Sequence, residues 1–223
     1  MLTSLDISKN KDLKELRCDY NKLSFLEIYN NKILEVFDCQ SNLLDSLDVS
    51  KNIALKKFKC NRNKFKNIDI SQNVALEELH CTKNQLKNLN VSNNVSLTIL
   101  FCDQNMLREV DFSKNLNLKI LNCSSNSLIF LDLSKNSLLY SLICFNNQLK
   151  ILDFSKNINL TELECGINQL TSLNIKNGNN SNMQFFGFSS NYNLGCIQVD
   201  DVIYAKRRWA EIEKNVYFSE NCN

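Results

Sequence analysis

Cysteine is the residue type whose spacing in this chain most strongly suggests chemistry. Eight of the ten cysteines follow one another every 21 residues: Cys18, Cys39, Cys60, Cys81, Cys102, Cys123, Cys144 and Cys165. A column of thiolates could bind a soft metal ion. Each of these cysteines nevertheless takes an apolar position of a repeated motif, where cysteine behaves as a small hydrophobic residue. We therefore predict a packed column with no metal or cofactor. Disulfides within it are not expected, because in-register Cβ atoms lie about 4.8 Å apart, against about 3.8 Å in a disulfide.

His80 is the only histidine and the next candidate for catalysis. It directly precedes Cys81, but adjacent residues of a strand point to opposite faces, so these two side chains do not form a catalytic pair. The sequence contains no nucleophile elbow, phosphate-binding loop or cluster of metal ligands. We therefore expect a protein that is not an enzyme, with His80 on its surface.

An acidic residue recurs at one outward position and could form a ladder of calcium sites. The members of this acidic row are Asp6, Glu27, Asp48, Asp69, Asp111, Asp132 and Asp153. Stacked about 4.8 Å apart, these carboxylates repel one another unless their charge is compensated. A serine two residues on, such as Ser50, and a lysine three residues on, such as Lys51, offer that compensation. Local compensation is therefore the preferred interpretation over bound calcium.

These residues belong to a repeat of 21 residues. One half follows L-x-x-L-x-C-x-x-N, as in LKELRCDYN, and the other follows L-x-x-L-[DN]-x-S-x-N, as in LDSLDVSKN. Alternate apolar residues indicate a strand. One coil cannot bury its own apolar side, so successive coils must stack. Neither half has room for a full helix, and we predict a flattened, weakly curved solenoid of parallel strands.

Stacking predicts columns of equivalent side chains. One interior column is Leu16, Phe37, Phe58, Leu79, Leu100, Leu121, Leu142 and Leu163. Two asparagine ladders should lie at the turns, one from Asn21 to Asn168 and one from Asn31 to Asn157, each with a 21-residue step. Their amides can pair with backbone groups that would cost about 1–3 kcal/mol each if buried and unpaired. The chain has no proline, so we expect asparagine, which tolerates left-handed backbone, to form the turns.

The two halves together resemble the leucine-rich repeat L-x-x-L-x-L-x-x-N/C-x-L, with cysteine in the third apolar place. This resemblance implies a right-handed β-rich solenoid, classed with the α/β leucine-rich-repeat folds. We assign residues 1–180 to a half-repeat followed by eight 21-residue repeats. Residues 181–223 are assigned to a degenerate last repeat and a C-terminal cap. In that last repeat, Met183, Phe186, Phe188 and Asn191 resume the pattern after a short insertion.

The cap contains a stretch with helical spacing: Tyr204, Arg208, Trp209 and Ile212. We predict a short helix that lays Trp209 and Ile212 over the last coil. The tail, with LGCIQVD, a tryptophan and FSENC, is similar to the end of the repeat region in secreted and surface leucine-rich-repeat proteins of bacteria. That resemblance implies a Cys196–Cys222 disulfide and an extracellular location. No signal peptide is visible, and the chain opens inside a repeat, so we expect a leader or cap upstream of Met1.

The outward strand positions change character along the array. They are polar in repeats 1 to 4, but repeats 5 to 7 carry Ile99, Phe101, Ile120, Tyr140, Ile143 and Phe145. A contiguous exposed apolar patch marks an interaction site, and drift without function is the alternative. The predicted binding surface has Phe101, Tyr140, Ile143 and Phe145 in its centre and His80, Asp103 and Arg62 at its rim. A second apolar set, Ile129, Phe130 and Ile151, falls on another side.

Composition narrows the partners. The net charge is only +2, with acids and bases interspersed, which does not favour nucleic acid. No apolar run approaches the roughly 18 residues of a membrane helix, so membrane insertion is not expected. We predict a non-catalytic module that binds a protein or glycan in a secreted or surface bacterial protein, such as an adhesin or host-interaction factor. A self-associating homodimer module and the targeting part of a larger effector enzyme are the alternatives.

Overall fold

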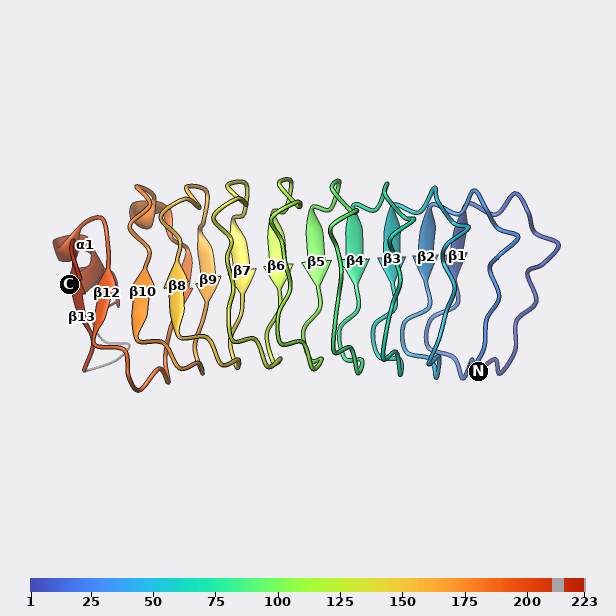
Figure 1. Cartoon of the computed structure of the whole chain (residues 1–223), viewed down its shortest axis with the longest axis horizontal. Helices are drawn as coiled ribbons and strands as arrows, with labels where there is room; N and C mark the ends of the chain where they lie inside the picture. The colour runs from blue at the N-terminus through green and yellow to red at the C-terminus, as the bar shows by residue number, and fades with distance from the viewer. Residues whose placement is uncertain (210–214, 223) are drawn as a thin grey trace.

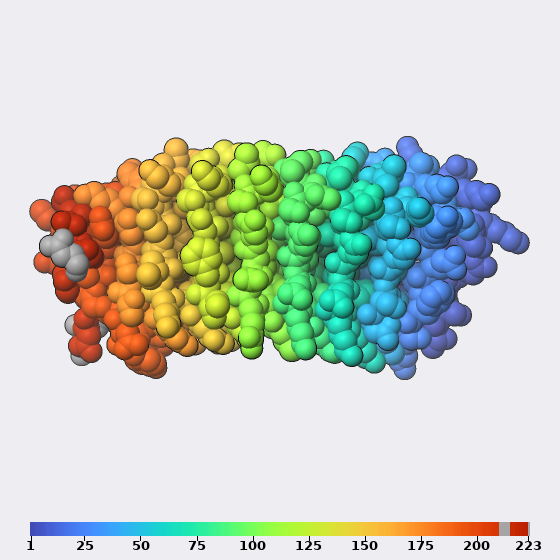
Figure 2. Space-filling view, viewed as in Figure 1, coloured from blue at the N-terminus to red at the C-terminus, as the bar shows by residue number. Residues whose placement is uncertain are grey.

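A computed structural model describes residues 1–209 and 215–222. The chain winds into a solenoid whose coils stack along one long, nearly straight axis (Figure 1). Nine short strands pair in parallel in the order β1-β2-β3-β4-β5-β6-β7-β9-β11. They are β1 (Glu15–Arg17), β2 (Val36–Asp38), β3 (Lys57–Lys59), β4 (Glu78–His80), β5 (Ile99–Phe101), β6 (Ile120–Asn122), β7 (Ser141–Ile143), β9 (Glu162–Glu164) and β11 (Phe185–Gly187). In the space-filling view the coils form successive bands between the two ends (Figure 2). The weakly curved parallel solenoid is thereby confirmed.

The second half-repeats form a smaller parallel sheet near the C-terminus, in the order β13-β12-β10-β8. Its strands are β8 (Ile151–Asp153), β10 (Ser172–Asn174), β12 (Cys196–Gln198) and β13 (Tyr217–Ser219). Before residue 151, the described second half-repeats carry no assigned strand. The side that carries β1 to β7, β9 and β11 therefore has strand pairing in successive coils along the solenoid. We call this side the strand face.

The middle residue of each strand on this face points into the solenoid. Leu16 pairs with Phe37, Phe37 with Phe58, and the register continues unbroken through Leu163. The rings of Phe37 and Phe58 stack with their centroids 5.5 Å apart. The eight cysteines are free thiols and all are buried. Burial raises the pKa of the Cys123 thiol to about 12, so this side chain stays protonated and packs as a neutral group.

The two asparagine ladders connect the coils, as predicted. Asn63 Nδ2 donates hydrogen bonds to the carbonyls of Cys39 (3.0 Å) and Cys60 (3.2 Å), and its Oδ1 accepts one from the backbone N–H of Leu44 (3.0 Å). In the second ladder, Asn73 Nδ2 donates to the carbonyls of Val49 (3.0 Å) and Asn52 (2.9 Å). Each amide therefore joins its own coil to the preceding one. In the first ladder Asn63 pairs with backbone groups of both coils, whereas in the second ladder Asn73 adds a second donor to carbonyls that already accept a backbone N–H.

The left-handed turn residue is not the ladder asparagine, which corrects the expectation from composition. A positive φ falls one residue before each asparagine of the first ladder, with values of 51–62° at Tyr20, Ser41, Arg62, Lys83, Gln104, Ser125, Asn146, Ile167 and Ser190. Left-handed backbone costs a residue with a Cβ roughly 1–2 kcal/mol. The neighbouring asparagine stabilises the turn through its amide, so residues of many types can occupy the strained position.

The C-terminal cap closes the last coil. Phe186 pairs with Leu163, so the strand register resumes across the insertion as predicted. The helix α1 (Val202–Trp209) carries Trp209, which is buried with its ring centroid 5.0 Å from that of Phe186. Cys196 and Cys222 form the predicted disulfide, with Cα atoms 6.0 Å apart. Ile212 of the predicted helix lies outside the described residues, and the short 3-10 helix η1 (Asn180–Asn182) occupies the insertion.

Candidate functional site

The strand face carries the predicted apolar residues in rows that cross the coils. Phe101 lies next to His80 on one side and Asn122 on the other, and Ile143 follows Asn122 in the same row. The ring centroids of Phe101 and His80 are 4.6 Å apart. Phe101 and Ile143 thus share one outward face, as predicted, with a polar residue between them.

Ser141 and Asn122 separate the apolar residues of the strand face into two clusters. Ile99 and Ile120 are paired across β5 and β6, beside Phe101, and the next residue in that row is Ser141. Ile143 and Phe145 lie beyond Ser141 and Asn122. Each cluster is half-buried, and Tyr140, which precedes β7 directly, is 40% exposed.

Charges at the N-terminal rim of the surface are compensated internally. Glu78 forms ion pairs with Lys57 (3.3 Å) and Lys59 (3.4 Å). His80 Nε2 lies 2.8 Å from Glu78 Oε1. Burial lowers the pKa of His80 and outweighs the opposing charge of Glu78, so the imidazole is neutral at pH 7. For Glu78, burial acts to raise the pKa, but the hydrogen bond from Lys57 and the positive charges around it bring the pKa below its ordinary value. The predicted surface histidine is therefore largely covered by Phe101 and these charged groups.

The other two predicted rim residues are placed differently. Asp103 is buried and accepts hydrogen bonds from Thr82 Oγ1 (2.7 Å) and Gln104 Nε2 (3.3 Å). Arg62 is exposed at the left-handed turn that follows β3, at a corner of the solenoid. The structure therefore brings His80 and Phe101 together and leaves Arg62 at the margin. The binding role of these residues stays a prediction.

A hollow at the C-terminal part of the strand face was not anticipated from the sequence. Its volume is about 410 Å³, and it lies over β9, between β7 and β11. Its lining side chains are Ser141, Ile143, Phe145, Glu162, Glu164 and Phe185. Phe185 is 52% exposed. The sequence did contain a signal for the outward position of Phe185. It directly precedes the inward Phe186, and adjacent residues of a strand point to opposite faces.

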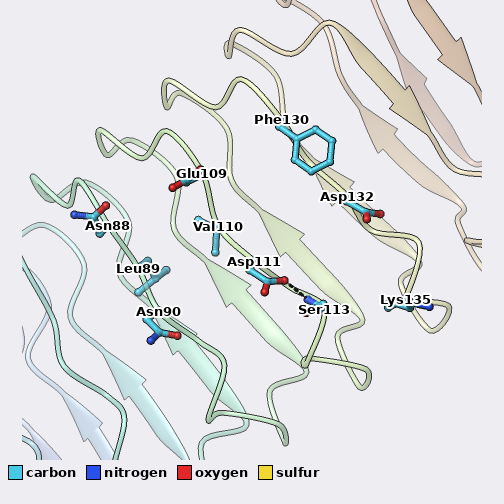
Figure 3. A pocket seen from close by; sticks show the side chains of 10 residues that line it. All are labelled: Asn88, Leu89, Asn90, Glu109, Val110, Asp111, Ser113, Phe130, Asp132 and Lys135. Atoms are coloured by element: carbon cyan, nitrogen blue, oxygen red, sulfur yellow. Dashed lines mark hydrogen bonds between the residues drawn. The ribbon is translucent and has the colours of Figure 1, made fainter.

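The acidic row lies on the other side of the solenoid and shapes turns. Asp111 Oδ1 accepts a hydrogen bond from the backbone N–H of Ser113 (2.8 Å; Figure 3). The same contact recurs at Asp48 and Asp69, and it is the main reason that the pKa of each of these carboxyls is lowered. In the described part of the chain, no group of three or more His, Cys, Asp or Glu residues could hold a metal ion.

A second hollow lies on this same side, among the second half-repeats of neighbouring coils. Leu89, Val110 and Phe130 contribute its apolar lining (Figure 3). Its charged lining is Glu109, Asp111, Asp132 and Lys135. Phe130 is 67% exposed, and Ile129 and Ile151 adjoin it in a further shallow hollow. The second apolar set therefore does occupy one surface, on the side of the solenoid that carries the acidic row.

Solved structures with the same architecture identify the fold. No known family model matches the sequence, and no functionally curated protein matches it. The functional domain of InlJ from Listeria monocytogenes, which includes a cysteine ladder, superposes with a TM-score of 0.72 and 26% identity over 97% of this chain. This chain has the leucine-rich-repeat solenoid fold. It spans 55% of the length of the InlJ chain.

Two further leucine-rich-repeat structures share the fold. A leucine-rich-repeat protein of Leptospira interrogans superposes with a TM-score of 0.68 and 20% identity, over 96% of this chain and 68% of its own. Internalin C2 of Listeria monocytogenes superposes with a TM-score of 0.64 and 18% identity, over 86% of this chain and 83% of its own.

Among the helices that the structure describes, none has the length and apolarity needed to cross a membrane.

Proposed function

We propose that this leucine-rich-repeat protein is a non-catalytic module that binds a protein ligand through its strand face. The observation that carries the proposal is the change in that face from compensated charge at β3 and β4 to partly exposed apolar residues on and beside β5, β6, β7 and β11. Large apolar side chains within a polar surround are the usual anatomy of a protein interface. A glycan ligand and a homodimer are the competing occupants of the same face.

The extracellular setting is also part of the proposal. The Cys196–Cys222 disulfide favours an oxidising compartment, and the similarity to InlJ and internalin C2 favours a secreted or surface bacterial protein, such as an adhesin. The chain matches little more than half of InlJ, so a larger native protein with further domains is compatible with it.

The test compares a surface variant with a core variant. Phe101→Ser/Phe145→Ser removes two half-buried rings and should lower the melting temperature by less than about 4 °C. Leu121 is fully buried, and Leu121→Ser should cost roughly 3–5 kcal/mol by opening a void and burying a hydroxyl. Binding is screened with a displayed peptide library and a glycan array, and self-association is measured by sedimentation. Peptide binding that the surface variant loses supports the proposal.

Three results would contradict it. Unfolding of the Phe101→Ser/Phe145→Ser variant would show that these rings belong to the core. Glycan binding or dimerisation lost in that variant, without peptide binding, would assign the face to the competing occupants. Equal binding by wild type and variant would place the interaction site elsewhere, with the hollow around Phe130 as the next candidate.

A further inference from the structure

The hollow over β9 has an unusual combination of walls and floor. Ile143 and Phe145 bound it on the β7 side, and Phe185 bounds it on the β11 side. Glu162 and Glu164 stand between these walls, because both are outward residues of the central strand β9. Two carboxylates are thus held in a concavity whose sides are apolar and partly aromatic.

These two carboxylates lack a cationic partner, unlike several glutamates nearer the N-terminus of the strand face. Near the N-terminus, Glu15 pairs with Arg17, Glu35 with Lys56, and Glu78 with two lysines. Asp38 of β2 also has no ion pair among the described residues, but it accepts hydrogen bonds from Gln40. Within residues 1–209 and 215–222, no lysine, arginine or histidine lies within ion-pair distance of Glu162 or Glu164. Among the described residues, the one hydrogen bond to either carboxylate is donated by the backbone N–H of Gly166 to Glu164 Oε1 (3.1 Å).

Glycine at position 187 makes room for this arrangement. Gly187 is paired with Glu164 across β9 and β11, and a Cβ at position 187 would overlap the Glu164 carboxylate. The absence of a side chain there lets the carboxylate lie against the sheet, at the floor of the hollow. The φ of Gly187 is not in the left-handed region. A larger residue at this position would therefore be disfavoured by steric overlap and not by backbone strain.

We infer that the hollow over β9 is the specificity pocket of the strand face and receives an arginine side chain from a protein ligand. This inference rests on the proposed function and names the chemistry of the partner. A guanidinium group can stack on a phenylalanine ring while its N–H groups donate to carboxylates. The planar, weakly hydrated guanidinium suits an aromatic-walled pocket better than the strongly hydrated ammonium of lysine. An arginine would supply the positive charge that Glu162 and Glu164 lack within the chain.

The first test uses a library of dodecapeptides displayed on phage and selected on the intact protein. Arginine should be enriched at one position of the selected peptides. Replacing that arginine by citrulline, which keeps the shape and removes the charge, should weaken binding at least 30-fold, and lysine at least 5-fold. Selected peptides without a conserved arginine, or equal binding of the citrulline peptide, would overturn the inference.

The second test changes the protein. Glu162→Gln/Glu164→Gln should weaken binding of the arginine peptide at least 30-fold with an unchanged melting temperature. Gly187→Ala keeps both charges but displaces one carboxylate, and should weaken binding several-fold. Glu109→Gln changes an exposed acid that lines the hollow on the other side; it is the control for charge lost away from the strand face and should bind like wild type.

The outcomes separate this inference from the proposed function. Peptides that lose binding in Phe101→Ser/Phe145→Ser but bind the Gln variant normally would refute the arginine pocket and leave the strand-face proposal standing. Failure to select any peptide that depends on the strand face would refute both. Equal losses of peptide binding in the Glu162→Gln/Glu164→Gln variant and in the Glu109→Gln control would attribute the effect to net charge. That outcome would refute the arginine pocket.

Discussion

At the scale of single residues, two asparagines four positions apart face opposite demands. Asn94 is fully buried, and its Nδ2 donates to the carbonyls of Ile70 (3.1 Å) and Asn73 (2.9 Å). Asn90 occupies the exposed acidic row, and its Oδ1 accepts a hydrogen bond from the backbone N–H of Ser92 (3.0 Å). The buried position needs a donor, whereas the exposed position needs an acceptor.

Aspartate should therefore be harmful at one position and harmless at the other. Asn94→Asp places a carboxylate oxygen against the carbonyl oxygens of Ile70 and Asn73, removes the amide hydrogen bond from each, and buries a charge without a partner, which should cost more than about 3 kcal/mol. Asn90→Asp reproduces the contact made by Asp69 and Asp111 and should change stability by less than about 0.5 kcal/mol. Urea unfolding of both variants measures the difference. A small effect of Asn94→Asp would mean that the buried ladder contributes little to stability.

At the scale of the elements, each coil contains one strained turn. Ile167 holds this position with a φ of 51°, although it is β-branched and 54% exposed. Asn146 fills the same position in the preceding coil. Asparagine tolerates left-handed backbone, so Ile167→Asn should stabilise the protein by about 1 kcal/mol and raise the melting temperature by roughly 2–4 °C. Ile158→Asn, at 58% exposure and with ordinary φ, is the control and should bring no gain.

The cap is an element whose stability should depend on its disulfide. The Cys196–Cys222 bond closes a loop with a sequence separation of 26 residues, for which chain entropy predicts roughly 3–4 kcal/mol. Cys222→Ser should loosen β12, β13 and α1 while distant coils are unaffected, because a solenoid transmits stability only between neighbours. Hydrogen exchange should accelerate around Trp209 and stay unchanged in β1 to β6. Uniform acceleration along the chain would contradict this local behaviour.

At the scale of the whole molecule, the acidic row couples stability to pH. Hydrogen bonds from backbone N–H groups lower the pKa values of Asp6, Asp48, Asp69, Asp111 and Asp132 from the ordinary value of 3.8. A carboxyl with a lowered pKa in the folded state stabilises that state above pH 4, and this contribution is lost as the pH falls through the folded-state value. We expect the loss to accumulate along the solenoid between about pH 4 and pH 2.

A neutral substitute isolates this effect. Asn90 and Asn174 accept the same backbone hydrogen bond without titrating. Asp111→Asn/Asp132→Asn should therefore lose less stability than wild type between pH 5 and pH 2.5, measured by thermal melts at constant ionic strength. Parallel curves for the two proteins would assign acid sensitivity to other groups.

The sequence alone determined the interior of this protein. The 21-residue period assigns an equivalent position in every coil to each residue, and an inward position must be apolar or carry an amide that donates to backbone carbonyls. Leu121, Cys123 and Asn126 can therefore be placed from one coil and transferred to the rest. The cap followed from the same logic, because the final coil needs a covering residue and Trp209 was the large side chain available. Burial imposes these constraints separately on each coil, so the repeated pattern can be recognised from a single sequence.

Only the tertiary structure decided how the outward side chains meet. Whether Phe185 lies beside Glu162 depends on the register across the insertion at residues 177–182, where the period breaks. The hollow over β9 further depends on Gly187, which leaves room for a side chain from the neighbouring strand. The left-handed turn residue was likewise hidden, because the amide of the next asparagine permits almost any side chain there. Outward positions carry no burial requirement of their own, so their arrangement is set by neighbours about one repeat away in the chain.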